Sequence, residues 1–304
     1  MNVLNVDSSG KKPTVISLFA GCGGSSLGYQ MAGFKELLAV EWDDNAVETF
    51  RLNFPDVPVY HGDIAKLSGQ ECMKLAGIKK NSLDILDGSP PCQGFSTAGK
   101  RKWSDPRNSL FNEFVRLLDE LQPKVFVMEN VTGMVKGYMK QAYLQIIKSL
   151  RECGYKAKGE VLNAMYFNVP QSRQRVIIIG VREDLGIEPS HPKPQGRALG
   201  LRRALGLRRG WGKLNEGIKN KQFNNQWRSL DLPCVTLEKT RPPIILQDGI
   251  ERELTLKECA IIASYPADFK WAKRAYQRIG NSVPPNLMKA IAEHIKREIL
   301  NKKG

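Results

Sequence analysis

The chain has 304 residues, of which 41% are hydrophobic and 25% are charged, which fits a folded protein with one large domain and a smaller one. Its formal net charge of +15 favours polyanionic partners, nucleic acid before an anionic membrane, and no basic amphipathic helix supports a membrane. The apolar runs are too short to span a bilayer, and six scattered cysteines with three histidines indicate neither a metal site nor a disulfide framework.

Short apolar strands alternate with amphipathic helical segments through the first half of the chain. In chain order we expect strands at 15–19, 37–40, 57–61, 83–86 and 124–128, and helices from about 24, at 45–53, at 108–121 and from about 141. A further apolar strand is expected at 176–179. This alternation predicts an α/β fold built on a doubly wound, mostly parallel sheet.

The pattern changes after residue 182, where Gly, Arg, Lys, Asn and Pro predominate up to about residue 227. Thr255 and Glu258 then have the spacing of a helix capping box, and Pro284 and Pro285 open a last helix whose i, i+4 stripe indicates core packing. The predicted division is a large domain at 1–185, a small region at 186–254, and a return to the large domain at 255–304.

The turn after the first strand contains glycines at positions 21, 23 and 24, which let a backbone approach a ligand over a helix N-terminus. The dinucleotide fingerprint requires glycine at position 26, which is Ser26, so a nicotinamide cofactor is disfavoured. Glu41 could hold ribose hydroxyls, Trp42 could stack on a purine, and Asp63 could accept from an exocyclic amine. Together these strand-end residues favour a nucleoside cofactor over a merely structural turn.

Cys92 follows a short apolar strand and two prolines, so it is a candidate nucleophile with a fixed approach. The alternative is a small buried hydrophobic residue, as most free cysteines are. Glu129 ends another strand, and in a parallel sheet its carboxyl would lie at the same edge as the thiol.

Three long polar side chains precede or begin the strand at 176–179. Alternation would place Gln171, Arg173 and Arg175 on one face. A solvated strand end would also explain them, just as a helix cap would explain Glu129.

Five segments combine into one ordered pattern, namely Phe19–Gly24, Pro90–Gln93, Glu129–Val131, Gln171–Arg175 and Arg278–Pro285. Together they resemble the motif set of the bacterial and phage DNA cytosine-5 methyltransferases. The resemblance covers nearly all of the chain except residues 186–226, and the motifs are jointly specific. It implies a class I S-adenosylmethionine-dependent methyltransferase fold with a small, basic target-recognition domain.

The resemblance also implies the reaction, in which a methyl group passes from S-adenosylmethionine to carbon 5 of cytosine in a specific short sequence of double-stranded DNA. Cys92 would add to carbon 6 of the flipped base, and Glu129 would contact ring nitrogen 3 and the exocyclic amine. Arg175, with Arg173, would steady the base and its neighbouring phosphate. A base that the sequence does not identify would then remove the proton at carbon 5.

The implied cofactor contacts are Phe19, Ala20, Gly21, Cys22, Gly23, Gly24, Glu41, Trp42, Asp63, Ile64, Pro90, Leu110, Asn281 and Ser282. Only the resemblance places Asn281 and Ser282, because the residues alone predict a turn there. The expected DNA contacts are Gln93, Ser96, Lys100, Arg101, Gln171, Arg202, Arg203, Arg208 and Arg209.

Two basic segments bear on DNA binding. Residues 94–107 are rich in glycine and basic residues, and their place after the nucleophile favours closure over DNA against an ordinary solvated loop. The sequence Leu-Gly-Leu-Arg-Arg occurs at 199–203 and 205–209, an offset that does not align its arginines on one helical face. Phosphate contact from a loop or short helix is therefore favoured over a groove-reading helix.

The recognition region is short for the family and has no clear hydrophobic core of its own, so either a compact reader or a second polypeptide would supply sequence specificity. A tRNA substrate and a non-catalytic, nucleic-acid-binding relative are the alternatives. We expect a cytoplasmic monomer that belongs to a restriction-modification system or is a solitary phage-like enzyme, without a stable endonuclease complex.

Overall fold

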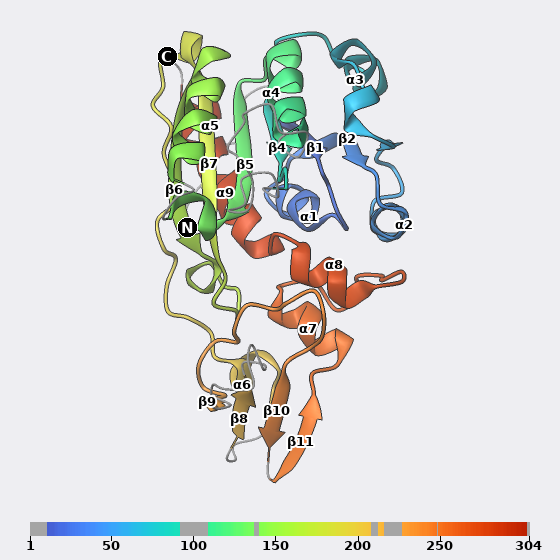
Figure 1. Cartoon of the computed structure of the whole chain (residues 1–304), viewed down its shortest axis with the longest axis vertical. Helices are drawn as coiled ribbons and strands as arrows, with labels where there is room; N and C mark the ends of the chain where they lie inside the picture. Colours follow the sequence, from blue (N-terminus) through green and yellow to red (C-terminus); the bar gives the residue numbers. More distant parts are fainter. Residues whose placement is uncertain are drawn as a thin grey trace.

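The computed structural model describes residues 11–91, 109–136, 140–207, 212–215, 227–247 and 249–302. A larger sheet occupies the upper part of Figure 1 and a smaller one the lower part, with α7 (Leu256–Ile262) and α8 (Ala275–Asn281) between them. Among the described helices, none combines the length and the apolar composition that crossing a bilayer requires.

The larger sheet has the strand order β3-β2-β1-β4-β5-β7-β6. Its strands are β1 (Thr14–Leu18), β2 (Lys35–Glu41), β3 (Val59–His61), β4 (Ile85–Gly88), β5 (Val125–Val131), β6 (Tyr155–Asn163) and β7 (Gln174–Arg182). Strands β1 to β5 pair in parallel, and β7 runs antiparallel to both β5 and β6. The sheet is therefore doubly wound and mostly parallel, as predicted, and its strand order reverses between β1 and β4.

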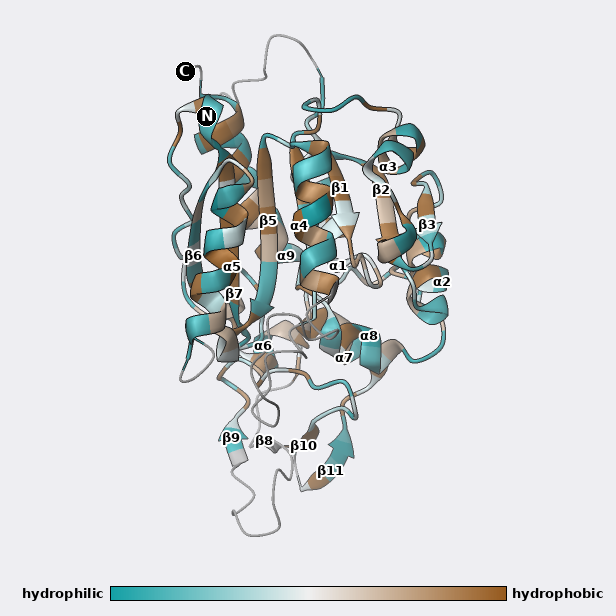
Figure 2. Ribbon diagram, turned by 45° about the horizontal axis from the view of Figure 1, so that its top comes forward, coloured by the Kyte–Doolittle hydropathy of each residue, from teal (hydrophilic) through white to brown (hydrophobic). Residues whose placement is uncertain are grey.

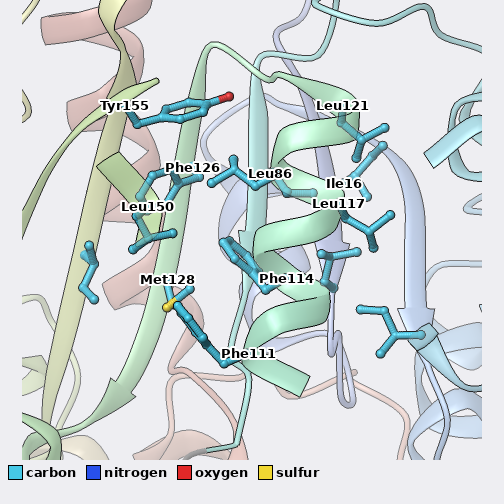
Figure 3. Packing of buried hydrophobic residues seen from close by; sticks show 14 of the residues in the cluster. Ile16, Leu86, Phe111, Phe114, Leu117, Leu121, Phe126, Met128, Leu150 and Tyr155 are labelled. Carbon is cyan, nitrogen blue, oxygen red and sulfur yellow. The ribbon is translucent and has the colours of Figure 1, made fainter. Parts of the chain in front are cut away.

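Side chains that alternate along the strands give this sheet two apolar faces. Ile16 and Leu86 belong to one buried cluster, and Val15 and Ile85 belong to another. The first face is covered by α3 (Gly69–Ala76), α4 (Ser109–Leu121) and α5 (Lys140–Glu152), and the second by α1 (Gly24–Met31) and α9 (Pro285–Ile295). Figure 3 shows the apolar stripe of α4 against the first face, with Phe111, Phe114, Leu117 and Leu121 pointing at the strands.

The smaller sheet is antiparallel, in the order β11-β10-β8-β9. Its strands are β8 (Gly212–Asn215), β9 (Trp227–Ser229), β10 (Ile244–Gln247) and β11 (Ile250–Glu253), and α6 (Leu201–Ala204) precedes them. Figure 2 shows that β11 is largely hydrophilic, in contrast to the central strand β5 of the larger sheet. Leu201, Leu230 and Ile245 are buried, but they share one cluster with residues of α2 (Asp44–Asn53), α7 and α8. The described part of the small region thus completes a shared core.

The expected strands and helices of the first half are present with ends shifted by a few residues, and the capping box at Thr255 and Glu258 is formed on both sides. The antiparallel strand β6 and the helix α3 were not expected from the sequence. Their segments contain many charged residues, because β6 lies at an edge of the sheet and α3 has one exposed side.

The helices α1 and α9, which are far apart in the sequence, pack against each other. A Cβ atom on Gly28 would lie 2.6 Å from Cβ of Met288 and 2.6 Å from the carbonyl oxygen of Pro285. Real side chains do not approach so closely, so only glycine allows the two helices this separation. The backbone of α1 at Gly28 is therefore in direct contact with α9.

We expect Gly28→Ala to lower the free energy of unfolding by about 1–3 kcal/mol, because α9 must move to admit the methyl group. The helical preference of alanine works in the opposite direction and is smaller. Urea denaturation measures the change. Gly133→Ala is the matched control, since a Cβ atom there would meet nothing within 4 Å. Equal stability of Gly28→Ala and the unchanged protein would contradict the backbone contact.

Candidate active site at the carboxyl edge of the sheet

The carboxyl ends of β1, β2, β4 and β5 lie at one edge of the sheet, because these strands are parallel neighbours. The turn after β1 uses the left-handed region three times, with φ of 57° at Phe19, 57° at Gly21 and 91° at Gly23. A Cβ atom on Gly21 would meet nothing within 4 Å, whereas one on Gly23 would lie 2.3 Å from the ring of Phe54. The turn is thus packed on one side and open on the other.

Glu41 joins this turn to the end of β2. Its Oε2 accepts a hydrogen bond from the backbone N–H of Gly21 at 2.8 Å, and its Oε1 accepts from the N–H groups of Trp42 and Asp43 at 2.9 Å each. Trp42 directs its side chain outward and is 77% exposed. The carboxylate thus contacts the glycine turn, and the next residue along the chain presents an exposed indole.

Asp63 and Ile64 form the third strand-end turn. Asp63 is exposed and accepts from the N–H of Ala65 at 3.0 Å, while Ile64 is buried. Arg116 of α4 fixes this turn, since its Nη2 donates to the carbonyl oxygens of Ile64 at 3.1 Å and Leu67 at 2.8 Å. The predicted cofactor contacts Asp63 and Ile64 therefore belong to a turn that Arg116 of α4 holds in place.

Ser282 lies beside the glycine turn, although it is far from it in sequence, and Asn281 directly precedes Ser282 at the end of α8. A Cβ atom on Gly24 would lie 3.2 Å from Cβ of Ser282 and 2.4 Å from the carbonyl oxygen of Val283. The structure therefore brings together the two ends of the predicted cofactor site. Cys22 is different, because its side chain is buried and its Sγ lies 3.2 Å from the Tyr265 hydroxyl. Burial raises the pKa of the Cys22 thiol to about 11, and only its backbone can face a ligand.

The predicted nucleophile, Cys92, lies outside the described residues. Pro90, two positions before it, is buried, and its carbonyl oxygen accepts from Nδ2 of Asn130 at 2.9 Å. Leu110, in the first turn of α4, is partly buried against the core of the first face. Of the predicted DNA contacts, Gln93, Ser96, Lys100, Arg101, Arg208 and Arg209 also lie outside the described ranges. The segment that leads to Cys92 is thus tied to the strand end that carries Glu129.

Glu129 and Arg175 form a buried ion pair. Nε of Arg175 lies 2.8 Å from Oε1 of Glu129, and the two side chains are 13% and 10% exposed. The strand register explains the contact, because Glu129 on β5 is opposite Ile177 on β7 and Val131 is opposite Arg175. A buried charge is stable only with a partner, so each residue fixes the other at this edge.

The expectation that Gln171, Arg173 and Arg175 share one face of a strand is wrong, because β7 begins at Gln174. Gln171 is buried, and its Oε1 accepts from the N–H of Leu237 at 3.0 Å. Arg173 is 2% exposed and donates from Nη2 to the carbonyl oxygen of Gly280 at 2.9 Å. Both side chains hold later segments of the chain against the sheet.

The two predicted DNA contacts that the structure describes in the small region lie on α6. Arg203 is exposed, and Arg202 is paired with Asp231, with Nε 2.8 Å from Oδ1.

A buried polar group that the sequence analysis missed lies under the glycine turn. Asp87 of β4 accepts from the Tyr29 hydroxyl at 3.2 Å, and burial raises the pKa of Asp87 to about 7. Burial likewise raises the pKa of Glu36 to about 8, although the nearby Ser17 and Ser26 hydroxyls oppose part of this increase. A charge that interrupts an apolar strand, such as Asp87 after Ile85 and Leu86, was the available signal.

The comparisons with known proteins agree with this architecture. The family described as C-5 cytosine-specific DNA methylase matches residues 13–206 and 205–297. The chain belongs to this family. The methyltransferase is 34% identical to the type II methyltransferase M1.HphI of Haemophilus parahaemolyticus over 93% of its own length and 86% of the relative. It is 29% identical to M.FnuDI of Fusobacterium nucleatum over 95% of each chain.

Solved structures show the same fold. A protein described as a DNA modification methyltransferase encoded within an E. coli prophage superposes with a TM-score of 0.77 at 24% identity, over 96% of this chain and 100% of that one. The S. pombe Dnmt2 methyltransferase superposes with a TM-score of 0.67 at 21% identity, again over 96% and 100%. The protein is thus a DNA cytosine-5 methyltransferase with the fold of its class.

The buried acids predict how stability depends on pH. In the unfolded chain both carboxyl groups ionise near pH 4. In the folded protein they hold their protons up to about pH 7 for Asp87 and about pH 8 for Glu36. Between about pH 4 and these values the native state binds more protons than the unfolded state, so the free energy of unfolding falls as the pH rises through that range.

We expect Asp87→Asn to remove part of that fall, on the order of a few kcal/mol between pH 5 and pH 8. Urea denaturation at the two pH values measures it. Asp268→Asn, at an exposed position, is the control and should leave the slope unchanged. An unaltered slope in Asp87→Asn would show that Asp87 titrates alike in the folded and unfolded states.

Proposed function

We propose that this enzyme transfers a methyl group from S-adenosylmethionine to carbon 5 of cytosine in a short sequence of double-stranded DNA, through a transient bond between Cys92 and the flipped base. The observation that carries the proposal is the buried Glu129–Arg175 pair. It lies at the same edge of the sheet as Pro90, from which the chain leads to Cys92. Addition to a cytosine ring requires a thiol nucleophile, and an acid paired with an arginine can polarise the ring that the thiol attacks.

The turns that follow β1, β2 and β3 form what we call the cofactor edge, and their residues fit S-adenosylmethionine. The open side of Gly21 leaves room for a ligand, and the carboxylate of Glu41 has lone pairs beyond its three backbone contacts for ribose hydroxyls. The exposed face of Trp42 can stack on a purine, and the exposed Asp63 can accept from its amine. When bound, the cofactor would supply a methyl group carried on a positively charged sulfur, which would keep the electron pair of the broken carbon–sulfur bond and leave as a neutral thioether.

The protein's own groups would act on the cytosine in sequence. The Cys92 thiolate adds to carbon 6, and the electron pair of the carbon 5–carbon 6 double bond moves to carbon 5, which takes the methyl group. Loss of the proton at carbon 5 then restores the double bond and expels the thiolate. Arg175 contacts Oε1 of Glu129, so we assign to Oε2 a proton that is donated to ring nitrogen 3 as the thiolate adds. The carboxyl group also accepts a hydrogen bond from the exocyclic amine.

Arg175 has one described role and one proposed role. It holds Glu129 in place, and we propose that it also steadies the base and the neighbouring phosphate. For Arg173 and Gln171 we propose positioning roles, since their polar atoms bond to the backbone of Gly280 and Leu237. A base inside a duplex is not accessible to a thiol, so the reaction requires the nucleotide to rotate out of the stack.

DNA binding is the proposed use of the positive charge of +15. We assign phosphate contacts to the basic residues of 94–107 and of the small region 186–254, which together would close over and read the site. Binding should therefore weaken steeply with salt. The type II names of the relatives support a restriction-modification role in the bacterial cytoplasm. We propose that the protein acts as a monomer without a stable endonuclease complex.

The direct test is methyl transfer from labelled S-adenosylmethionine to nucleic acid. We expect incorporation into duplex DNA and none into tRNA, and bisulfite sequencing of a plasmid after expression should reveal one short methylated sequence. Transfer to tRNA alone would replace the proposed substrate.

Cys92→Ser tests the covalent step. We expect methyl transfer to fall to background while DNA binding in a gel-shift assay survives, because a hydroxyl is a far weaker nucleophile than a thiolate. Cys153→Ser is the control, because Cys153 directly follows α5, is partly buried against the core of the first face and should keep full turnover. Undiminished turnover in Cys92→Ser would remove Cys92 from the mechanism.

A further inference from the structure

An arginine from near the C-terminus reaches the cofactor edge of the fold. Nη2 of Arg278, on α8, lies 2.9 Å from Oδ1 and 3.0 Å from Oδ2 of Asp43. The two side chains are 9% and 29% exposed, so water screens the pair only partly. The contact bridges 235 positions of the sequence, and it connects the helix that ends at Asn281 to the turn that follows β2.

Asp43 is a central residue of that turn. Its N–H donates to Glu41 at 2.9 Å, and its Oδ1 accepts from the N–H of Ala46 at 3.0 Å, so it caps α2. Burial by itself would raise the pKa of the Asp43 carboxyl, but the Ala46 N–H and the Arg278 guanidinium outweigh it and lower the pKa. Asp43 is thus a charged anchor directly after Trp42 and two positions after Glu41.

The helix that carries Arg278 is itself fixed from two other sides. Arg173 donates to the carbonyl oxygen of Gly280 at 2.9 Å. A Cβ atom on Gly280 would lie 2.6 Å from the backbone at Glu238 and Lys239. The helix is therefore a rigid support from which one side chain extends to the Trp42 turn.

We propose that Arg278 is a positioning residue for the cofactor, which acts through Asp43 to set where the Trp42 ring and the Glu41 carboxylate lie. The inference rests on the proposed binding of S-adenosylmethionine at this edge. Without the pair, the turn keeps its helix cap but loses its connection to α8, so the two cofactor contacts are no longer pre-oriented. Loss of the pair should therefore lower the affinity for the cofactor, while the rate of the chemical step beside Glu129 should stay nearly unchanged.

The test compares cofactor binding by calorimetry with turnover. We expect Arg278→Gln to raise the Kd and the KM for S-adenosylmethionine about 10-fold or more. Its kcat should stay within about 2-fold of that of the unchanged protein. Asp43→Asn keeps a capping side chain and removes the charge, so it should weaken binding to a similar extent. The double variant should be no weaker than either single variant, because both changes remove the same contact. Arg278→Lys should restore part of the affinity.

Arg252→Gln is the matched control. Arg252 pairs with Glu258 through two contacts of 2.8 and 2.7 Å at the start of α7, away from the cofactor edge, so cofactor affinity should change less than 2-fold. Urea midpoints of all variants separate positioning from general stability, and Asp43→Asn keeps the test decisive if Arg278→Gln does not fold.

The outcomes are distinguishable from those of the proposed function. Binding of S-adenosylmethionine by the unchanged protein with equal affinity in Arg278→Gln and Asp43→Asn would overturn the positioning role alone. Losses in the double variant that multiply those of the single variants would also overturn it. Absence of binding by the unchanged protein would overturn the proposed cofactor and, with it, this inference.

Discussion

The Glu129–Arg175 ion pair is the contact on which the proposed site depends. Two charges can be this well buried only because each partners the other, and their meeting requires β7 to run antiparallel beside β5 in one register. A shift of that register by one residue would turn Arg175 to the opposite face of the sheet. The reversal of strand direction at β7 is therefore what places a cation beside the acid of a parallel strand.

The same edge is built from both ends of the chain. Close backbone contact at Gly24 and Gly28 brings the segment after α8 and the helix α9 onto the first turn and helix. Three arginines from distant elements then reach toward this edge, namely Arg116, Arg173 and Arg278, and each donates to a backbone carbonyl or a carboxylate. The strand-end turns are thus held from outside, which leaves their open sides available for ligands.

Much of this arrangement could be predicted from the sequence, because it follows from local patterns. The alternation of strands and helices gave the parallel sheet, and parallel strands place Glu41 and Glu129 at one edge without further information. Local patterns cannot predict which distant segment a polar side chain will contact. Gln171 and Arg173 were expected to follow strand alternation, but the strand begins after them and their polar atoms satisfy the backbone of segments far along the chain. The buried Asp87 was missed for a related reason, since its partner Tyr29 comes from another element.

The most direct test of the proposed active site is to trap the proposed covalent step on duplex DNA in which fluorine replaces the hydrogen at carbon 5 of the target cytosine. After methyl transfer there is no proton to remove, so the thiolate cannot leave and the adduct persists. With S-adenosylmethionine present, we expect mass spectrometry to find the DNA bonded to the peptide that contains Cys92. Methylation of ordinary duplex DNA without any such adduct, or an adduct on a different cysteine, would contradict the active site described above.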